Sequence, residues 1–393
     1  MIKKLSASRA VSMSGLLALT LAIGCAAPTA AAPKAAAAGT DRPAGRTVEV
    51  PGLVVSPYSE AELAVEFEKA RALLIAGRRR EAADAFDRLV RLAPDSALLA
   101  PPSLLDAGIA HEDLGERDTA IDRYREVARR FPAHETAKQA LLRSARIQAD
   151  LERWRELAAT SGELVARGDL TVLEAVEAHG QRALGLVELG SLEDAARAVM
   201  DARDLIEKNR LGEAGKPPTE LAVVAFALGE VRKKKSEQVT FSPVPPSLAD
   251  VLEQRCVGLL DAQAAYSDAM RSLDAHWSAM AGYRVGQLYQ QLHHDVMQIL
   301  PPGKADSLKK KQLFEGAMRL RYRVLLEKGL KMMDGTVRLG QRTGESSPWI
   351  ARAEEAKRDL ERALADERAA LARLPFSEAE IQSALDGLAS KKP

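Results

Sequence analysis

One pattern occurs twice without a gap, at 77–94 and at 115–132, and it constrains the fold more than any other feature of the chain. Each copy has glycine first, alanine five residues later, an aromatic residue nine later and proline seventeen later. These residues are Gly77, Ala82, Phe86 and Pro94, and then Gly115, Ala120, Tyr124 and Pro132. Glycine commonly ends a helix in the left-handed conformation, and proline cannot continue one. A small alanine lets a second helix approach closely, so the pattern predicts closely packed helix pairs.

The pattern continues in weaker form beyond the second copy. Gly190 and Ala195 repeat the first two positions after a predicted helix at 173–189. The 75 residues from Gly115 to Gly190 leave room for about two units, so we expect a degenerate third unit with helices at 138–149 and 154–167. Trp154 stands near the start of its second helix.

The spacing resembles the second half of a tetratricopeptide repeat, a helix-turn-helix unit of about 34 residues. The resemblance extends over 61–204 and implies an α-solenoid that presents a surface to a partner. Gly77 and Gly115 are 38 residues apart, which implies an insertion of four residues. We expect this insertion at 98–103, where Pro101 and Pro102 lie, and the next helix at 104–114.

Composition agrees with a long helical array. The chain has 393 residues, of which 46% are hydrophobic, 28% charged and 4% aromatic. Helix formers are abundant and strand formers are sparse, which favours an all-α fold. The net charge of +1 argues against a general nucleic-acid binder, which needs a clearly basic face.

The first residues predict a targeting segment. Lys3, Lys4 and Arg9 precede a short apolar run at 11–23 that ends just before Cys25. This arrangement resembles a bacterial lipobox, which implies a signal peptide at 1–24 and a lipidated Cys25. The alternative is an ordinary secretory signal cut after Ala27 or Ala30. Ala26, directly after the cysteine, favours the outer membrane over inner-membrane retention.

The remaining chain divides by composition into a tether and two lobes. The Ala- and Pro-rich residues 25–58 predict a disordered tether with a reach of roughly 30 Å. Residues 59–239 predict the repeat lobe, and Pro243, Pro245 and Pro246 make 240–246 a rigid connector. Within the repeat lobe, two glycines and two prolines break the pattern at 210–218. A helix is expected to follow at 219–235, with Leu221, Val224, Ala225 and Leu228 pointing inward. Residues 247–393 predict a lobe of longer, repeat-like helices at 247–273, 275–300, 307–339 and 348–374, covered by a short capping helix at 377–388.

Three sequence signals mark helix starts. Ser59 with Glu62, and Ser377 with Glu380, have the spacing of a capping box. Ser347 followed by Pro348 combines a capping hydroxyl with proline at the first helical position.

The lipobox, tether and repeats together resemble tetratricopeptide-repeat lipoproteins of Gram-negative envelopes. The helices around 283–289 and 349–353 look like those of myxobacterial envelope and gliding-motility proteins. The resemblance implies a non-catalytic scaffold on the periplasmic face of the outer membrane. It would bind peptide or helical segments of envelope proteins, such as motility, secretion, pilus or outer-membrane assembly machinery.

No group of residues predicts an active site. His293 and His294 are adjacent, so on a helix they point about 100° apart and cannot easily share a metal ion. His111-Glu112 lacks the second histidine of a zinc-protease motif. We therefore expect no catalytic residue, metal, cofactor, nucleic acid or small-molecule substrate. The alternative is a cell-wall or glycan-associated enzyme, or an accessory to one, with its active part at 247–374. Self-association through the end helices is compatible with either.

Two basic runs and one cysteine complete the candidates. The runs are read first as solvated helix ends and second as contacts for an anionic partner; their lysines are Lys233, Lys234, Lys235, Lys309, Lys310 and Lys311. Cys256 lies in an apolar helical pattern and is predicted to be a buried, inert thiol. The aromatic residues at 277–289 are predicted to be mainly core.

Overall fold

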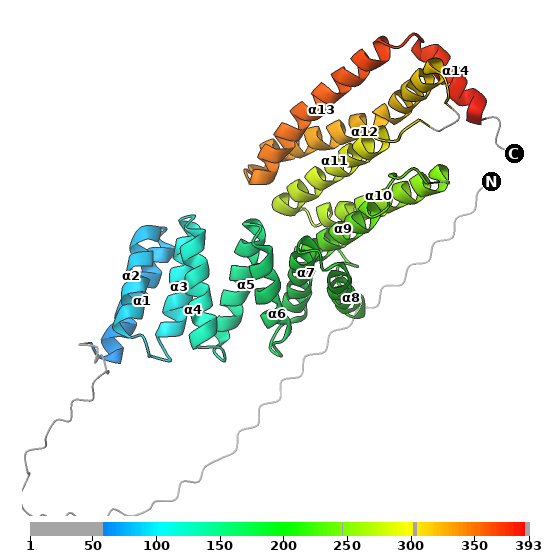
Figure 1. Cartoon of the computed structure of the whole chain (residues 1–393). Coiled ribbons are helices and arrows are strands. Elements are labelled where there is room, and N and C mark those ends of the chain that lie inside the picture. The colour runs from blue at the N-terminus through cyan, green and yellow to red at the C-terminus, as the bar shows by residue number, and fades with distance from the viewer. Residues whose placement is uncertain (1–57, 246, 302–304, 390–393) are drawn as a thin grey trace, which may run out of the picture. The chain divides into compact units, whose positions relative to one another are not determined.

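A computed structural model describes residues 58–245, 247–301 and 305–389, and this part of the chain consists of fourteen α-helices (Figure 1). The predicted all-α fold is confirmed. The signal peptide, Cys25 and nearly all of the tether lie outside the described residues. The helices are α1 (Glu60–Ile75), α2 (Arg79–Leu92), α3 (Ala100–Asp113), α4 (Arg117–Arg130), α5 (Glu135–Asp150), α6 (Trp154–Val165), α7 (Val172–Glu188), α8 (Leu192–Lys208), α9 (Leu221–Glu237), α10 (Leu248–Met270), α11 (Ala275–Met297), α12 (Leu308–Thr343), α13 (Pro348–Ala372) and α14 (Glu378–Ala389).

The helices from α1 to α13 stack in chain order, and each packs on the next (Figure 1). The first helix of each early pair also contacts the first helix of the following pair, from α1 through α3, α5 and α7 to α9. Such nearest-neighbour packing is typical of repeat arrays, in which each unit buries the open apolar face of the previous one.

A residue with positive φ separates the two helices of each of the first four pairs. Gly77, Gly115 and Gly190 have φ of 74°, 78° and 84°. In the third pair Glu152 occupies the position, with φ of 57°, 37 residues after Gly115 and 38 before Gly190. The left-handed conformation costs about 1–2 kcal/mol for a residue with a Cβ. The third unit is thus regular in structure, and its glycine signal is missing because glutamate adopts the glycine conformation.

The other repeat positions lie in the core. Ala82, Ala120 and Ala195 have no exposed surface. The aromatic residues Phe86 and Tyr124 are equally buried, and the Tyr124 hydroxyl donates a hydrogen bond to Glu112 at 2.6 Å. These residues define the fold by packing and are not available to a partner.

The backbone carbonyls of the two repeat prolines accept hydrogen bonds from arginines of the following unit. Pro94 follows α2, and its carbonyl oxygen accepts a hydrogen bond from Arg130 at the end of α4. The carbonyl of Pro132 accepts an equivalent bond from Arg167 at 3.1 Å. Both prolines lie just beyond the end of a helix, so their carbonyls have no partner within it; the arginines satisfy these carbonyls and join successive units.

Two predicted boundaries are wrong. The helix predicted at 104–114 begins at Ala100, with Pro101 and Pro102 in its first turn. Proline is tolerated there because the first N–H groups of a helix have no partner within it. The helix predicted to end at Leu339 continues to Thr343, where Gly344 ends it with φ of 74°.

The predicted helix starts are confirmed. Ser59 and Glu62 form both hydrogen bonds of a capping box at α1. Ser377 and Glu380 make the same contacts before α14. Ser347 is the N-cap residue of α13 and Pro348 its first helical residue, although the Ser347 hydroxyl makes no capping hydrogen bond.

The apolar core continues across the 240–246 connector. Phe241 is buried and belongs to the same core cluster as Val223 of α9 and Tyr266 of α10. α9 and α10 pack extensively against each other, and the described residues form one compact unit. The division into two lobes stays a prediction.

Charged side chains join the early helices to the later ones. Arg284 of α11 forms ion pairs with Glu230 of α9 at 2.7 Å and with Glu188 of α7 at 3.2 Å. Its guanidinium also lies 5.4 Å from the centre of the Trp349 ring of α13. Burial opposes the charge on Arg284, but the two carboxylates raise its pKa. Burial, and then Glu230, raise the pKa of Glu188.

A second contact lies beside this cluster. Glu152, at the positive-φ turn, pairs with Arg352 of α13 at 2.5 Å. His276 of α11 lies 3.2 Å from Asp150 of α5 and 3.8 Å from Glu345, which follows α12.

Within the described residues, no helix has the length and apolar character needed to cross a membrane.

Replacing Gly108 with alanine is expected to destabilise the protein. A Cβ at Gly108 would lie 2.3 Å from the ring of Tyr124, which is fully buried and cannot move aside cheaply. We expect a loss of about 1–3 kcal/mol in the free energy of unfolding, measured by denaturant titration. Gly162→Ala in α6 is the control, because nothing lies within 4 Å of the added carbon. An equal loss in both variants would contradict the close packing at Gly108.

His276 is expected to make stability depend on pH. Burial lowers the pKa of His276. The carboxylates of Asp150, Glu345 and Asp274 raise it by more than burial lowers it, so the pKa lies above its ordinary value. The imidazolium therefore stabilises the folded state at low pH, and this contribution is lost as pH rises through the raised pKa. His276→Gln should lower Tm more at about pH 5.5 than at about pH 8.5. A difference that is constant between these pH values would show that the pair with Asp150 contributes nothing.

Candidate partner-binding groove

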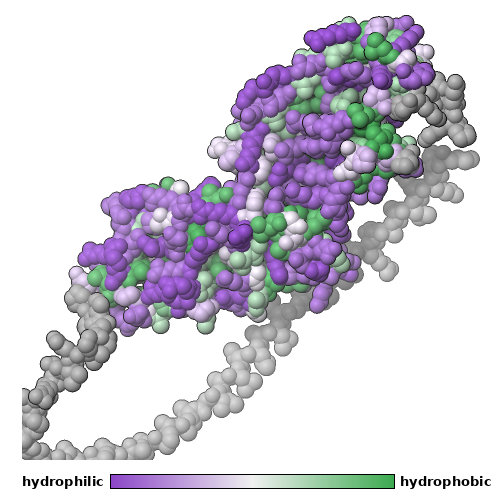
Figure 2. Space-filling model, viewed as in Figure 1, coloured by the Kyte–Doolittle hydropathy of each residue, from purple (hydrophilic) through white to green (hydrophobic). Residues whose placement is uncertain are grey.

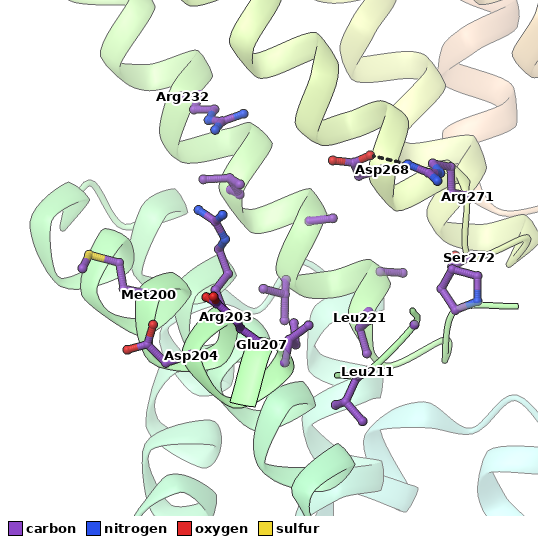
Figure 3. A pocket seen from close by; sticks show the side chains of 17 residues that line it. Met200, Arg203, Asp204, Glu207, Leu211, Leu221, Arg232, Asp268, Arg271 and Ser272 are labelled. Atoms are coloured by element: carbon purple, nitrogen blue, oxygen red, sulfur yellow. Dashed lines mark hydrogen bonds and ion pairs between the residues drawn. The ribbon is translucent and has the colours of Figure 1, made fainter. Parts of the chain in front are cut away.

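A groove of about 650 Å³ opens between α8, α9 and the end of α10 (Figure 3). Its walls come from α8, from the loop that joins α8 to α9, and from the last turn of α10 with the residues after it. This volume is in the range of pockets that hold a small ligand or part of a peptide.

The loop at 209–220 holds the groove open. α7 packs extensively on both α8 and α9, whereas α8 and α9 contact each other less. Arg210 and Gly212 have positive φ, and Pro217 and Pro218 stiffen the remainder of the loop. The break that the sequence predicts at 210–218 thus becomes the lower wall, with Leu211 and Pro217 facing the groove.

The groove has an apolar floor. It is formed by one face of α9, whose contributing residues are Leu221, Ala222, Val224, Ala225 and Leu228. Of the four residues predicted to point inward, Val224 is buried, whereas Leu221, Ala225 and Leu228 are only half-buried. The opposite face, with Val223, Phe226 and Ala227, fills the core instead. α9 is apolar on both faces, a pattern typical of a helix covered on both sides. This pattern, with the break before it, is the sequence signal from which the groove could have been found.

Charged side chains of both signs surround the floor. Arg203, Asp204 and Glu207 of α8 line the groove, and among the described residues none of them forms an ion pair. Across the groove, Asp268 and Arg271 of α10 pair with each other at 3.4 Å (Figure 3). Met200 stands at the rim with 61% of its surface exposed. An apolar floor with unpaired charges of both signs suits a peptide that carries both.

Most of the face seen in Figure 2 is hydrophilic, and hydrophobic residues reach this surface only in small groups. Exposed apolar patches rimmed by polar residues mark interaction sites.

The two predicted basic runs lie at a helix end and a helix start. Lys233 to Lys235 lie in the last turns of α9, where Lys233 is only 13% exposed and pairs with Glu237 at 2.9 Å. Lys309 to Lys311 lie in the first turn of α12. Lys310 pairs with Asp306 at 2.8 Å, and Lys309 lies 5.9 Å from the Phe376 ring centre. Their role as contacts for an anionic partner stays a prediction.

The histidine cluster shows no metal geometry. His293 is buried 3.7 Å from Glu367, and burial lowers its pKa. His294 faces away and bonds Gln298. In the described part of the chain, no three His, Cys, Asp or Glu residues come together as metal ligands.

The sequence predicts that Cys256 is buried, but in the structure the neighbouring Arg255 is the buried residue. Cys256 is half-buried, and burial raises its pKa. Its neighbour Arg255 is 3% exposed and donates to the Ser236 hydroxyl at 2.7 Å and to Asp295 at 3.0 Å. Nothing in the local helical pattern indicates this, because both partners are distant in sequence.

Comparison with known proteins agrees with the repeat. The family model of the tetratricopeptide repeat matches residues 103–134, which form α3 and α4 with their following turn. No curated protein matches the chain.

Solved structures with similar folds share little sequence with the chain. The apo form of RapI has 11% identity over 78% of this chain and 99% of its own, with a TM-score of 0.42. A tetratricopeptide repeat protein from Parabacteroides merdae has 12% identity over 75% and 99%, with a TM-score of 0.41. The MamA RS-1 ArsTM double mutant has 17% identity over 54% and 97%, with a TM-score of 0.35. At these identities and TM-scores the likenesses carry no argument about function. The chain thus contains a tetratricopeptide repeat at 103–134, within an all-α stack of helix pairs.

Proposed function

We propose that this protein is a non-catalytic scaffold that binds a segment of another envelope protein in the groove between α8 and α9. The observation that carries the proposal is the apolar floor on α9, where the core buries Leu221, Ala225 and Leu228 only in part. A repeat array is rigid along its length, so the groove is preorganised and a bound peptide pays most of the ordering cost.

The partner is a peptide or a short helix with apolar side chains and charges of both signs. Leu221, Ala225 and Leu228 follow one another along one face of α9, and a bound helix can match that face at i, i+4 and i+7. Arg203 then faces an acidic side chain of the partner, and Glu207 a basic one. The three residues on α9 give affinity, and the charged rim selects the register.

The proposal includes an anchor in the outer membrane through Cys25. Its support is the basic, apolar and small-residue order of 3–25, together with the Ala- and Pro-rich sequence that comes after it. A lipid on Cys25 and a tether of about thirty residues let the repeat stack work at a distance of roughly 30 Å from the periplasmic leaflet. We propose that the partner belongs to a motility, secretion, pilus or outer-membrane assembly complex.

A photoreactive amino acid in place of Leu228 is expected to crosslink a partner in living cells. The same substitution at Leu98, which is 67% exposed and distant from the groove in the chain, is the control and should crosslink weakly. Arg203→Glu should reduce the Leu228 crosslink about tenfold, because it places like charges together. Arg197→Glu is its control, since Arg197 lies on the same helix but pairs with Asp194 and does not line the groove. Equal crosslinks at Leu228 and Leu98, or turnover of a wall substrate by the purified protein, would contradict a groove-binding scaffold.

Cys25→Ala is expected to abolish labelling by radioactive palmitate. The lipid is attached through the thiol, so its removal also releases the protein from the membrane fraction. Cys256→Ala is the matched control and should label as the wild type does. Equal labelling of the wild type and Cys25→Ala would disprove the anchor and leave the groove proposal intact.

A further inference from the structure

A second groove, of about 480 Å³, lies between α12 and the turn that joins α10 to α11. One wall is a stripe on α12 that contains Met332, Gly335 and Leu339. The other is formed by the end of α10, the turn and the start of α11, with Met270, Leu273, Ala275, Ser278 and Gly282. We call this site the α12 groove.

The turn presents an apolar side chain in a strained conformation. Leu273 has φ of 58° and is 74% exposed. The left-handed conformation costs about 1–2 kcal/mol at a residue with a Cβ, and exposing a leucine adds to that cost. The hydroxyl of Ser272 bonds the Ala269 carbonyl at 2.8 Å, and Asp274 caps α11 through the Trp277 N–H at 2.9 Å. The fold therefore holds Leu273 at the mouth of the groove, as expected for a residue retained for binding.

The floor has room for an incoming side chain at Gly335. Nothing lies within 4 Å of the Cβ that Gly335 lacks, although Gly335 is in the middle of a long helix. By contrast, Gly282 and Gly340 are glycines because Thr336 and Ile350 fill the space beside them. A glycine in a helix interior costs about 1 kcal/mol relative to alanine, and at Gly335 no neighbour within the described chain accounts for it.

Unpaired positive charge stands at both ends of the stripe. Lys331 and Arg342 line the groove, are exposed, and form no ion pair among the described residues. The only acidic residue in the lining is Asp274, whose carboxylate is engaged in capping α11. The other acid nearby on α12, Asp334, pairs with Arg338 and with Lys357 of α13. The groove thus has an apolar centre and a net positive rim.

We propose that the α12 groove binds an amphipathic helix of a partner protein that carries an acidic side chain at each end of its apolar face. Lys331 and Arg342 are eleven residues apart on one helix, a distance of about 16 Å. A partner helix of about three turns spans this distance, with its central apolar side chain over Gly335 and a flanking one against Leu273. The positive rim distinguishes this site from the groove between α8 and α9, whose free charges are of both signs.

Selection from a peptide library tests the proposal. The probe is a pool of helical peptides of about 14 residues with leucine fixed at i, i+4 and i+7 and random charged or neutral residues at both ends. Purified full-length protein should enrich peptides with Asp or Glu at both ends. The double variant Lys331→Glu with Arg342→Glu should instead enrich peptides with Lys or Arg. Absence of enrichment, or the same preference with both proteins, would overturn the proposal.

Three further variants locate the binding site. Gly335→Leu fills the groove at an exposed helical position and should reduce the affinity of an enriched peptide at least tenfold without lowering Tm. Arg321→Glu with Lys328→Glu makes the same change of net charge as the double variant, at exposed positions of α12 outside the groove, and should leave affinity unchanged. Leu228→Glu disables the groove between α8 and α9 and should also leave the affinity of the enriched peptide unchanged. The tests of the two grooves are therefore independent. If the wild type forms a dimer in sedimentation and Gly335→Leu abolishes it, the occupant is a second copy of this chain and the proposal is wrong.

Discussion

Close approach of neighbouring helices, made by placing a large buried side chain against a glycine, is the interaction on which the stack depends. Tyr124 lies against Gly108, and Tyr266 lies against Gly229, so close that a Cβ on either glycine would overlap the ring. Met333 and Thr336 of α12 use Gly286 and Gly282 of α11 in the same way. This device occurs both in the repeat pairs and in the longer helices, so the two regions pack by the same rule although only the first carries the repeat signature.

The grooves occur where this packing is interrupted. α8 and α9 are separated by a loop with two prolines, and the apolar face of α9 at Leu221, Ala225 and Leu228 is left only partly covered. At the α10–α11 turn, Leu273 points outward and Gly335 opposite it has no large neighbour. Elsewhere, cross-unit arginines and the Arg284 cluster fix the position of one unit on the next. Rigid helices with uncovered apolar faces are the physical basis for a binding function.

Much of the fold could be predicted because its signals are local. The helix starts at Ser59 and Ser377 and the turn glycines depend on residues within a few positions of one another. Glu152 was missed because a side chain elsewhere in the chain, Arg352, pairs with it in a glycine conformation. Arg255 and Arg284 were missed for the same reason, since a charged residue reads as exposed until its buried partners are known. The α8–α9 groove was half visible, as a broken pattern followed by a helix that is apolar on both faces. The α12 groove could not be predicted from the sequence, because it forms only when the α10–α11 turn lies against α12.

Amide hydrogen exchange of the full-length protein, alone and bound to the partner that crosslinks at Leu228, tests the central claim most directly. Binding to the apolar face of α9 should slow exchange in the second half of α8, in the loop at 209–220 and in the first half of α9. Exchange in α1 to α4 should stay unchanged, because those helices pack only on near neighbours. Slower exchange confined to other helices, or no change on binding, would contradict a scaffold that works through this groove.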